Sequence, residues 1–163
     1  MSSKNTKLLV QAAAIAAVYV VLTMVFAPFS FGEVQVRISE ALTILPFFTP
    51  AAIPGLFVGC LIGNILGGAI LPDIIFGSLA TLIGAVFSWM LRKNRYLVPI
   101  PPIVSNAVIV PLVLRFGYGI NLPIPMMMLT VGIGEVISCG VLGLILLFAL
   151  EKANAKSNIF KID

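Results

Sequence analysis

Long apolar runs, separated by short polar or proline- and glycine-rich breaks, dominate the sequence. The five longest runs are residues 8–26, 51–68, 73–91, 101–116 and 126–150. Each approaches the roughly 20 apolar residues that a membrane-spanning helix needs. A sixth run comprises residues 40–48. As a helix it would extend only about 13 Å, which is too short to cross a bilayer alone. The pattern predicts a single all-α membrane domain over residues 1–163 with six helical segments.

The segment between the first two runs has a different pattern. From Glu33 to Ser39, polar and apolar residues alternate, which is typical of an extended segment with one solvated face. Extended backbone cannot lie in lipid with its hydrogen-bonding groups unpaired. We therefore expect a strand-like loop at the membrane surface that forms one wall of a ligand site. Ser39 would then be the N-cap of the short helix at 40–48.

Two stripes of small residues predict close helix packing, because small side chains let membrane helices approach closely. The run 51–68 carries glycine at every fourth position, namely Gly55, Gly59, Gly63 and Gly67. The first run carries two alanine pairs, Ala12–Ala16 and Ala13–Ala17. These alanines either pack inside the bundle or form a docking face for another membrane subunit, and their spacing favours neither.

Composition agrees with a membrane protein, since 60% of the residues are hydrophobic and 10% are charged, against about 25% charged in soluble domains. The first run is too long for the apolar part of a signal peptide, and no small-residue cleavage site follows it, so we expect it to stay as a helix. The sequence has no histidine, and Cys60 and Cys139 fall within predicted helices. We therefore expect no metal, no other cofactor and no disulfide framework.

The distribution of basic residues predicts an orientation. Six segments place both termini on one side, and that side carries all the lysines and arginines except Arg37 and Arg115. The positive-inside rule then puts both termini in the cytoplasm and the strand-like loop outside. This bias accounts for the net charge of +4 without a nucleic-acid partner.

Polar and charged residues gather mainly in the outer half of the predicted bundle, with one asparagine at mid-span. The candidate binding residues are Arg37, Glu40, Asn64, Asp73, Asn106 and Glu135. A carboxylate as deep as that of Glu135 costs about 3 kcal/mol or more unless it is partnered or hydrated. Together these groups predict an outward-facing pocket for a planar molecule with mixed donors and acceptors. An aromatic side chain that stacks on such a ring would come from Phe29, Phe31 or Tyr118.

The charged candidates also have purely structural interpretations. Glu135 could pair with Arg37 or Arg115 and lock two helices together. Arg37 could instead form an ion pair within the loop, with Glu40 or Glu33.

The remaining candidates have structural interpretations too. Asn64 and Asn106 could simply form hydrogen bonds between helices. Asp73, which follows Pro72, could serve only to meet the positive end of a helix dipole. Each interpretation removes one residue from the predicted pocket.

The sequence contains no P-loop motif, no inverted repeat of the kind found in secondary transporters, and no nucleophile–base pair. We therefore expect a binding protein, not an enzyme, whose energy comes from a partner. The alternatives are a self-contained carrier or channel, which needs no other subunit, and a structural membrane anchor, which binds no ligand.

Four segments resemble the QueT family: RISEALTILPFFTPAAIPGLFVGCLIGN, DIIFGSLATLIGA, PPIVSNAVIV and VGIGEVIS. Members of this family are substrate-binding S components of energy-coupling factor (ECF) transporters. They are associated with uptake of queuosine precursors, which are 7-deazaguanine bases or queuine. The resemblance implies a six-helix bundle in the cell membrane that holds its ligand near the outer face, under the first loop.

The resemblance also implies partners. An alanine motif on the first helix docks onto a transmembrane coupling subunit, which two ATPases power, and here it corresponds to Ala12, Ala13, Ala16 and Ala17. The six candidate binding residues correspond to family motif residues, without indicating which of them touch the ligand. Gly63 departs from the alanine expected there, which should affect packing and not specificity.

These implications suggest roles for the candidates. Glu135 would accept hydrogen bonds from the pyrimidine N–H groups, and Asn106 or Asn64 would fix the carbonyl edge. Arg37 and Glu40 would shape a lid over the site. A ligand that carries an aminomethyl cation would meet Glu33 or Asp73.

Overall fold

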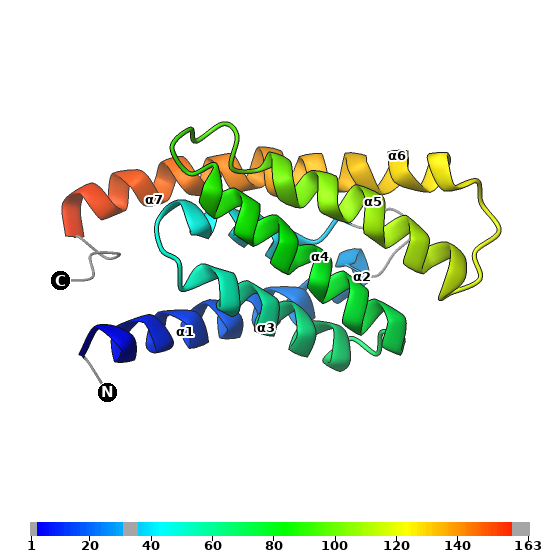
Figure 1. Cartoon of the computed structure of the whole chain (residues 1–163), viewed down its shortest axis with the longest axis horizontal. Coiled ribbons are helices and arrows are strands. Elements are labelled where there is room, and N and C mark those ends of the chain that lie inside the picture. Colours follow the sequence, from blue (N-terminus) through cyan, green and yellow to red (C-terminus); the bar gives the residue numbers. More distant parts are fainter. Residues whose placement is uncertain (1–2, 31–35, 158–163) are drawn as a thin grey trace.

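The computed structural model describes residues 3–30 and 36–157, and all regular structure within these residues is helical (Figure 1). The longer helices are α1 (Ser3–Val25), α3 (Ala52–Leu66), α4 (Leu71–Met90), α5 (Ile100–Phe116), α6 (Ile124–Glu135) and α7 (Gly143–Ser157). The shorter elements are α2 (Ala27–Ser30), the 3-10 helix η1 (Ile38–Phe47) and the π-helical segment η2 (Val136–Leu142), which joins α6 to α7. The all-helical prediction is therefore confirmed for the described residues.

The helices lie side by side in one bundle, and their connections alternate between its two ends (Figure 1). The two termini and the α4–α5 connection lie at the left end in this view. The α3–α4 turn and the α5–α6 loop lie at the right end. This arrangement agrees with the topology expected from the sequence, whereas the side that faces the cytoplasm remains a prediction from the basic residues.

Within the described residues, three helices are long and apolar enough to cross a membrane: Lys4–Val25, Leu71–Met90 and the continuous Ile124–Asn154. The apolar helices α3 and α5 are shorter, with 15 and 17 residues. The described residues thus have the helices of a membrane protein, and six complete crossings remain a prediction.

The short segment η1 differs from its prediction. It begins at Ile38, and its N-cap is Arg37 in an extended conformation, so the assignment of Ser39 as N-cap is wrong. Ser39 lies inside the helix, where its Oγ accepts a hydrogen bond of 2.8 Å from the Thr23 hydroxyl. A 3-10 helix rises about 2.0 Å per residue, so η1 is also more extended than the predicted α-helix. Residues 31–35, which include Glu33, lie outside the described part of the chain, and Val36 and Arg37 form no strand.

The η1 segment is enclosed by the bundle. Every residue from Ser39 to Pro46 is buried, and η1 packs against α1, α3, α4, η2 and α7. Ile44 and Leu45 join the apolar core, which includes Leu56 of α3 and Leu147 of α7. A 3-10 helix of this length is uncommon by itself, so tertiary contacts must stabilise it.

The glycine ladder of α3 brings this helix against α1. A Cβ added to Gly55 would lie 2.8 Å from the Ala12 carbonyl oxygen, and one added to Gly59 would lie 2.8 Å from the Tyr19 Cβ. Gly63 faces Thr23. The predicted close approach is confirmed for Gly55 and Gly59, whereas a Cβ on Gly63 would make ordinary contact with Thr23, and Gly67 lies beyond the helix as its C-cap.

The alanines of α1 divide between two sides of the helix. Ala16 is buried, and its backbone lies against Gly59, just as the Ala12 backbone lies against Gly55. Ala13 and Ala17 are exposed on the outer side of α1. Ala12 and Ala16 therefore lie in the contact with α3, as the internal-packing alternative expects, whereas a docking role for any of these alanines stays a prediction.

The Gly59→Ala substitution tests the α1–α3 contact. The added methyl group would meet the Tyr19 Cβ and the Ala16 backbone, so we expect the free energy of unfolding to fall by about 1–3 kcal/mol, seen as a drop of several degrees in the Tm of the detergent-purified protein. Gly132→Ala in α6 is a matched control, because its Cβ would meet Ala107 at an ordinary 3.7 Å. Equal Tm values for the two variants would contradict this description of the contact.

Candidate functional site

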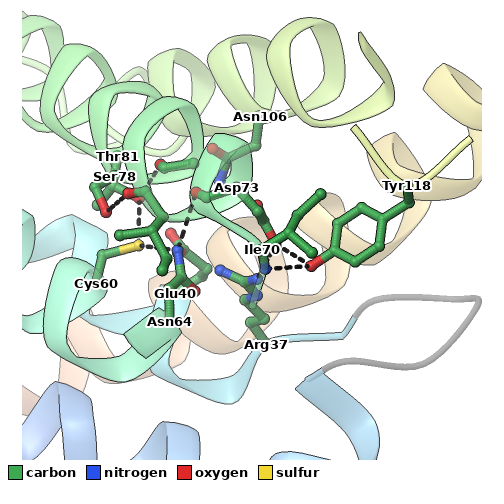
Figure 2. Close-up of polar contacts among 12 residues, drawn as sticks. Arg37, Glu40, Cys60, Asn64, Ile70, Asp73, Ser78, Thr81, Asn106 and Tyr118 are labelled. Carbon is green, nitrogen blue, oxygen red and sulfur yellow. Dashed lines mark hydrogen bonds and ion pairs between the residues drawn. The ribbon is translucent and has the colours of Figure 1, made fainter. Parts of the chain in front are cut away.

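All six candidate binding residues are buried, with exposed fractions from 1% to 7%. Five of them, Arg37, Glu40, Asn64, Asp73 and Asn106, lie in one region between η1, α3, α4 and α5 (Figure 2). The sixth, Glu135 at the end of α6, is joined to Asn106 by a hydrogen bond. The fold therefore gathers residues from five elements into one buried polar cluster, which we call the polar cluster below.

Glu40 enters the polar cluster from η1. The Tyr19 hydroxyl of α1 donates a hydrogen bond to Glu40 Oε1, whereas Oε2 has no hydrogen-bond partner. Both side chains are 1% exposed. One turn along α1, Thr23 donates to Ser39, so two buried hydrogen bonds fix the start of η1 against α1.

Glu135 is held by two donors. Asn106 Nδ2 donates to Oε1 at 3.0 Å, and the Cys139 thiol donates to Oε2 at 3.1 Å. Cys139 lies in the π-helical segment η2, which begins directly after Glu135. The predicted alternative of a pair with Arg115 is wrong, because the Arg115 guanidinium donates to the side chain of Asn121 at 3.0 Å.

Asp73 lies in the first turn of α4, as the sequence suggested, and it also has partners outside its helix. Arg37 Nη2 lies 4.0 Å from Asp73 Oδ2, and the Tyr118 hydroxyl donates to the same oxygen at 3.0 Å (Figure 2). Asn64 Nδ2 donates to the Asp73 carbonyl at 3.4 Å. A Cβ on Gly77 would lie 2.9 Å from Asp73 Oδ1, so glycine leaves room for this carboxylate.

Tyr118 closes this side of the polar cluster from the α5–α6 loop. Burial, together with the negative charge of Asp73, raises the pKa of its hydroxyl, so Tyr118 stays protonated and donates at neutral pH. Its hydroxyl also accepts a hydrogen bond from the Ile70 backbone N–H at 3.4 Å. Tyr118 thereby connects the two loops at this end of the bundle.

The two glutamates lie next to each other. A carboxylate oxygen of Glu40, one of Glu135 and the Cys139 sulfur all lie within 4.8 Å of one another. Two carboxylates and a thiol are groups that can ligate a divalent cation, but three of the four carboxylate oxygens already accept hydrogen bonds. The arrangement is equally suited to receiving N–H donors from an organic ligand.

The described part of the polar cluster is rich in acidic side chains. Its acids are Glu40, Asp73 and Glu135, and its guanidinium belongs to Arg37, so three acids face one base. Ionised groups are costly in a membrane interior unless they are paired, hydrogen-bonded or hydrated. The polar cluster is therefore chemically suited to a ligand that brings hydrogen-bond donors.

Sequence reasoning missed two residues that donate hydrogen bonds to the polar cluster, Tyr19 and Cys139. The available signals were weak: Tyr19 precedes Thr23 by one helical turn in an apolar run, and Cys139 follows Glu135 by four residues. Cys60 was missed as well. Asn64 Nδ2 and Thr81 Oγ1 lie 3.7 and 3.4 Å from its sulfur. The expected stacking role of Phe29 or Phe31 falls on side chains outside the described part of the structure.

Comparisons with known proteins agree with the resemblance seen in the motifs. The queuosine precursor transporter QueT of Lactococcus lactis subsp. cremoris is 38% identical over 85 residues, which cover 51% of this chain and 50% of that relative. The chain thus matches about half the length of this curated relative. No solved structure matches this chain. The family model described as QueT transporter matches residues 9–152. Because this match spans most of the chain, the protein belongs to the QueT transporter family, whose members are transporters and not enzymes.

Proposed function

We propose that this protein binds a queuosine precursor, either a 7-deazaguanine base or queuine, in the polar cluster. The observation that carries the proposal is the pair of buried carboxylates, Glu40 and Glu135, beside the Asn106 amide in an apolar helical bundle. The match to the QueT family and the name of the Lactococcus relative support this class of ligand.

The chemistry of a guanine-type ring fits these groups. Its pyrimidine edge presents neighbouring N–H donors, which a carboxylate such as Glu135 accepts, and a carbonyl oxygen, to which the amide of Asn106 or Asn64 donates. Arg37 and Glu40 cover the site from η1. A cationic substituent on the ring would find a counter-charge in Asp73, while Glu33, the other candidate for this role, lies outside the described residues.

We further propose that the protein is the S component of an ECF-type importer in the cell membrane. In this role the bundle crosses the membrane six times, has both termini in the cytoplasm and captures its ligand from outside. A transmembrane coupling subunit and two ATPases supply the energy, since the sequence carries no P-loop.

The docking face is the outer side of α1. Ala13 and Ala17 are exposed there, and the neighbouring Val10 and Val21 are 62% and 57% exposed. Ala12 is partly buried and Ala16 is buried, and the backbones of both lie against α3, so they offer less surface to a partner than Ala13 and Ala17 do. The proposed docking residues are therefore the outer pair of the four alanines.

Ligand binding by the purified protein alone is the first test. We expect saturable binding of 7-aminomethyl-7-deazaguanine or queuine by isothermal calorimetry, and none of adenine. Glu135→Gln should weaken binding about tenfold or more, because a hydrogen bond to a charged group contributes roughly 1.5–3 kcal/mol. Glu151→Gln is the matched control, since Glu151 pairs with Arg95 at 3.0 Å on the surface. Unchanged affinity in Glu135→Gln would remove this residue from the site.

Transport by the isolated chain is the second test. We expect liposomes that contain only this protein to bind the labelled precursor at their surface without accumulating it. Adding the coupling subunit and the two ATPases with ATP should produce accumulation. Uptake by the chain alone would instead support a self-contained carrier.

Substitutions on α1 test the docking face. We expect the double variant Ala13→Trp, Ala17→Trp to lose co-purification with the coupling subunit while keeping the affinity for the ligand, because both positions are exposed. The control, Ala12→Trp with Ala16→Trp, should lose folding and binding together, since these backbones lie against Gly55 and Gly59. Normal assembly of the Ala13, Ala17 variant would exclude this face.

A further inference from the structure

Among the described residues, two buried side chains carry a polar atom without a hydrogen-bond partner: Glu40 Oε2 and Ser138 Oγ. They belong to η1 and η2, which pack against each other. A hydroxyl can rotate to find an acceptor, whereas a carboxylate oxygen must be given a donor. Native proteins rarely leave a buried polar atom unpaired, so an orphan acceptor marks a place where a missing donor belongs.

The hydrogen bonds around Glu40 and Glu135 differ in a way that the sequence could not show. Both oxygens of Glu135 are occupied, by Asn106 and by Cys139. Glu40 has one oxygen fixed by Tyr19 and one oxygen free, at 1% exposure. The vacant acceptor of the carboxylate pair is therefore on Glu40, although the sequence singled out Glu135.

We infer that Glu40 is the specificity-determining residue of the site and accepts a hydrogen bond from the exocyclic amine of a guanine-type ring. This inference rests on the proposed function, because it names the ligand group that the same site selects. In this assignment Glu40 contacts the ligand directly, instead of only forming part of a lid over it. The site would take a 2-amino ring and reject the corresponding ring that lacks the amine.

The missing group must be a hydrogen-bond donor, such as an N–H group, because an acceptor or an anion would meet a carboxylate that already lies beside Glu135 and Cys139. In a guanine-type ring the amine and the ring N–H are adjacent donors, and here Glu40 and Glu135 are adjacent acceptors. Each carboxylate oxygen has two lone pairs, so Glu135 can accept the ring N–H while it keeps Asn106 and Cys139. The amine then supplies the partner that Glu40 Oε2 lacks.

A pair of bases tests the inference on the unmodified protein. 7-Deazaguanine and 7-deazahypoxanthine differ only in the exocyclic amine. We expect 7-deazahypoxanthine to bind at least about 30-fold more weakly, because without the exocyclic amine the buried Glu40 carboxylate oxygen stays unpaired. Similar affinities for the two bases would overturn the inference and leave the proposed function intact. Binding of neither base nor queuine would instead overturn the proposed function, and the inference with it.

Variants assign the selectivity to one carboxylate. In Glu40→Gln the affinity ratio of the two bases should fall to about 3-fold or less, since a neutral carbonyl is a weaker acceptor. In Glu135→Gln both bases should bind more weakly while the ratio stays near 30-fold, because both carry the ring N–H. A ratio unchanged in Glu40→Gln would overturn the assignment. If thermal unfolding shows that Glu40→Gln does not fold, the inference is decided by the affinity ratio of the two bases measured on the unmodified protein.

Discussion

The structure depends on one constraint, which is that each charged group inside an apolar helical bundle must be given partners. The 3-10 helix η1 meets this constraint for Glu40 by running through the interior, where Tyr19 and Thr23 of α1 hold its first turn. The π-helical segment η2 does the same for Glu135 by placing the Cys139 thiol against its carboxylate. Both non-α segments therefore lie where a buried carboxylate needs a donor, in line with the tendency of π-helical turns to occur at functional sites.

Helix packing and the polar cluster are mechanically linked through Tyr19. Its Cβ lies so close to Gly59 that a methyl group added to Gly59 would collide with it, while its hydroxyl donates to Glu40. The position of α1 against α3 therefore sets where that hydroxyl lies. Because a hydrogen bond weakens steeply as its geometry departs from linear, the glycine ladder contributes to the orientation of Glu40 as well as to stability.

The sequence predicted those features that depend on a period or on a residue type. Apolar runs gave most helix boundaries to within a few residues, and the spacing of Gly55 and Gly59 predicted a close helix contact, whose partner the structure identifies as α1. It could not predict η1 as a 3-10 helix, because that conformation is stabilised by contacts with five distant elements. It also could not show which alanines of α1 face inward, or that Glu40 and not Glu135 has the free oxygen, since both depend on partners distant in the chain.

The molecule reverses the usual distribution of side chains, and this reversal explains why its interior can be selective. Large apolar residues such as Leu9, Val25 and Leu129 are at least 60% exposed, while the acids of the polar cluster are at most 5% exposed. Such a surface requires lipid around it, so no bulk water reaches the cluster through its walls. In this low-dielectric interior a satisfied hydrogen bond is stronger and an unsatisfied one more costly than in water. A ligand that lacks one donor is therefore penalised more heavily than it would be on a soluble protein's surface, and a small number of buried carboxylates is enough to distinguish closely related rings.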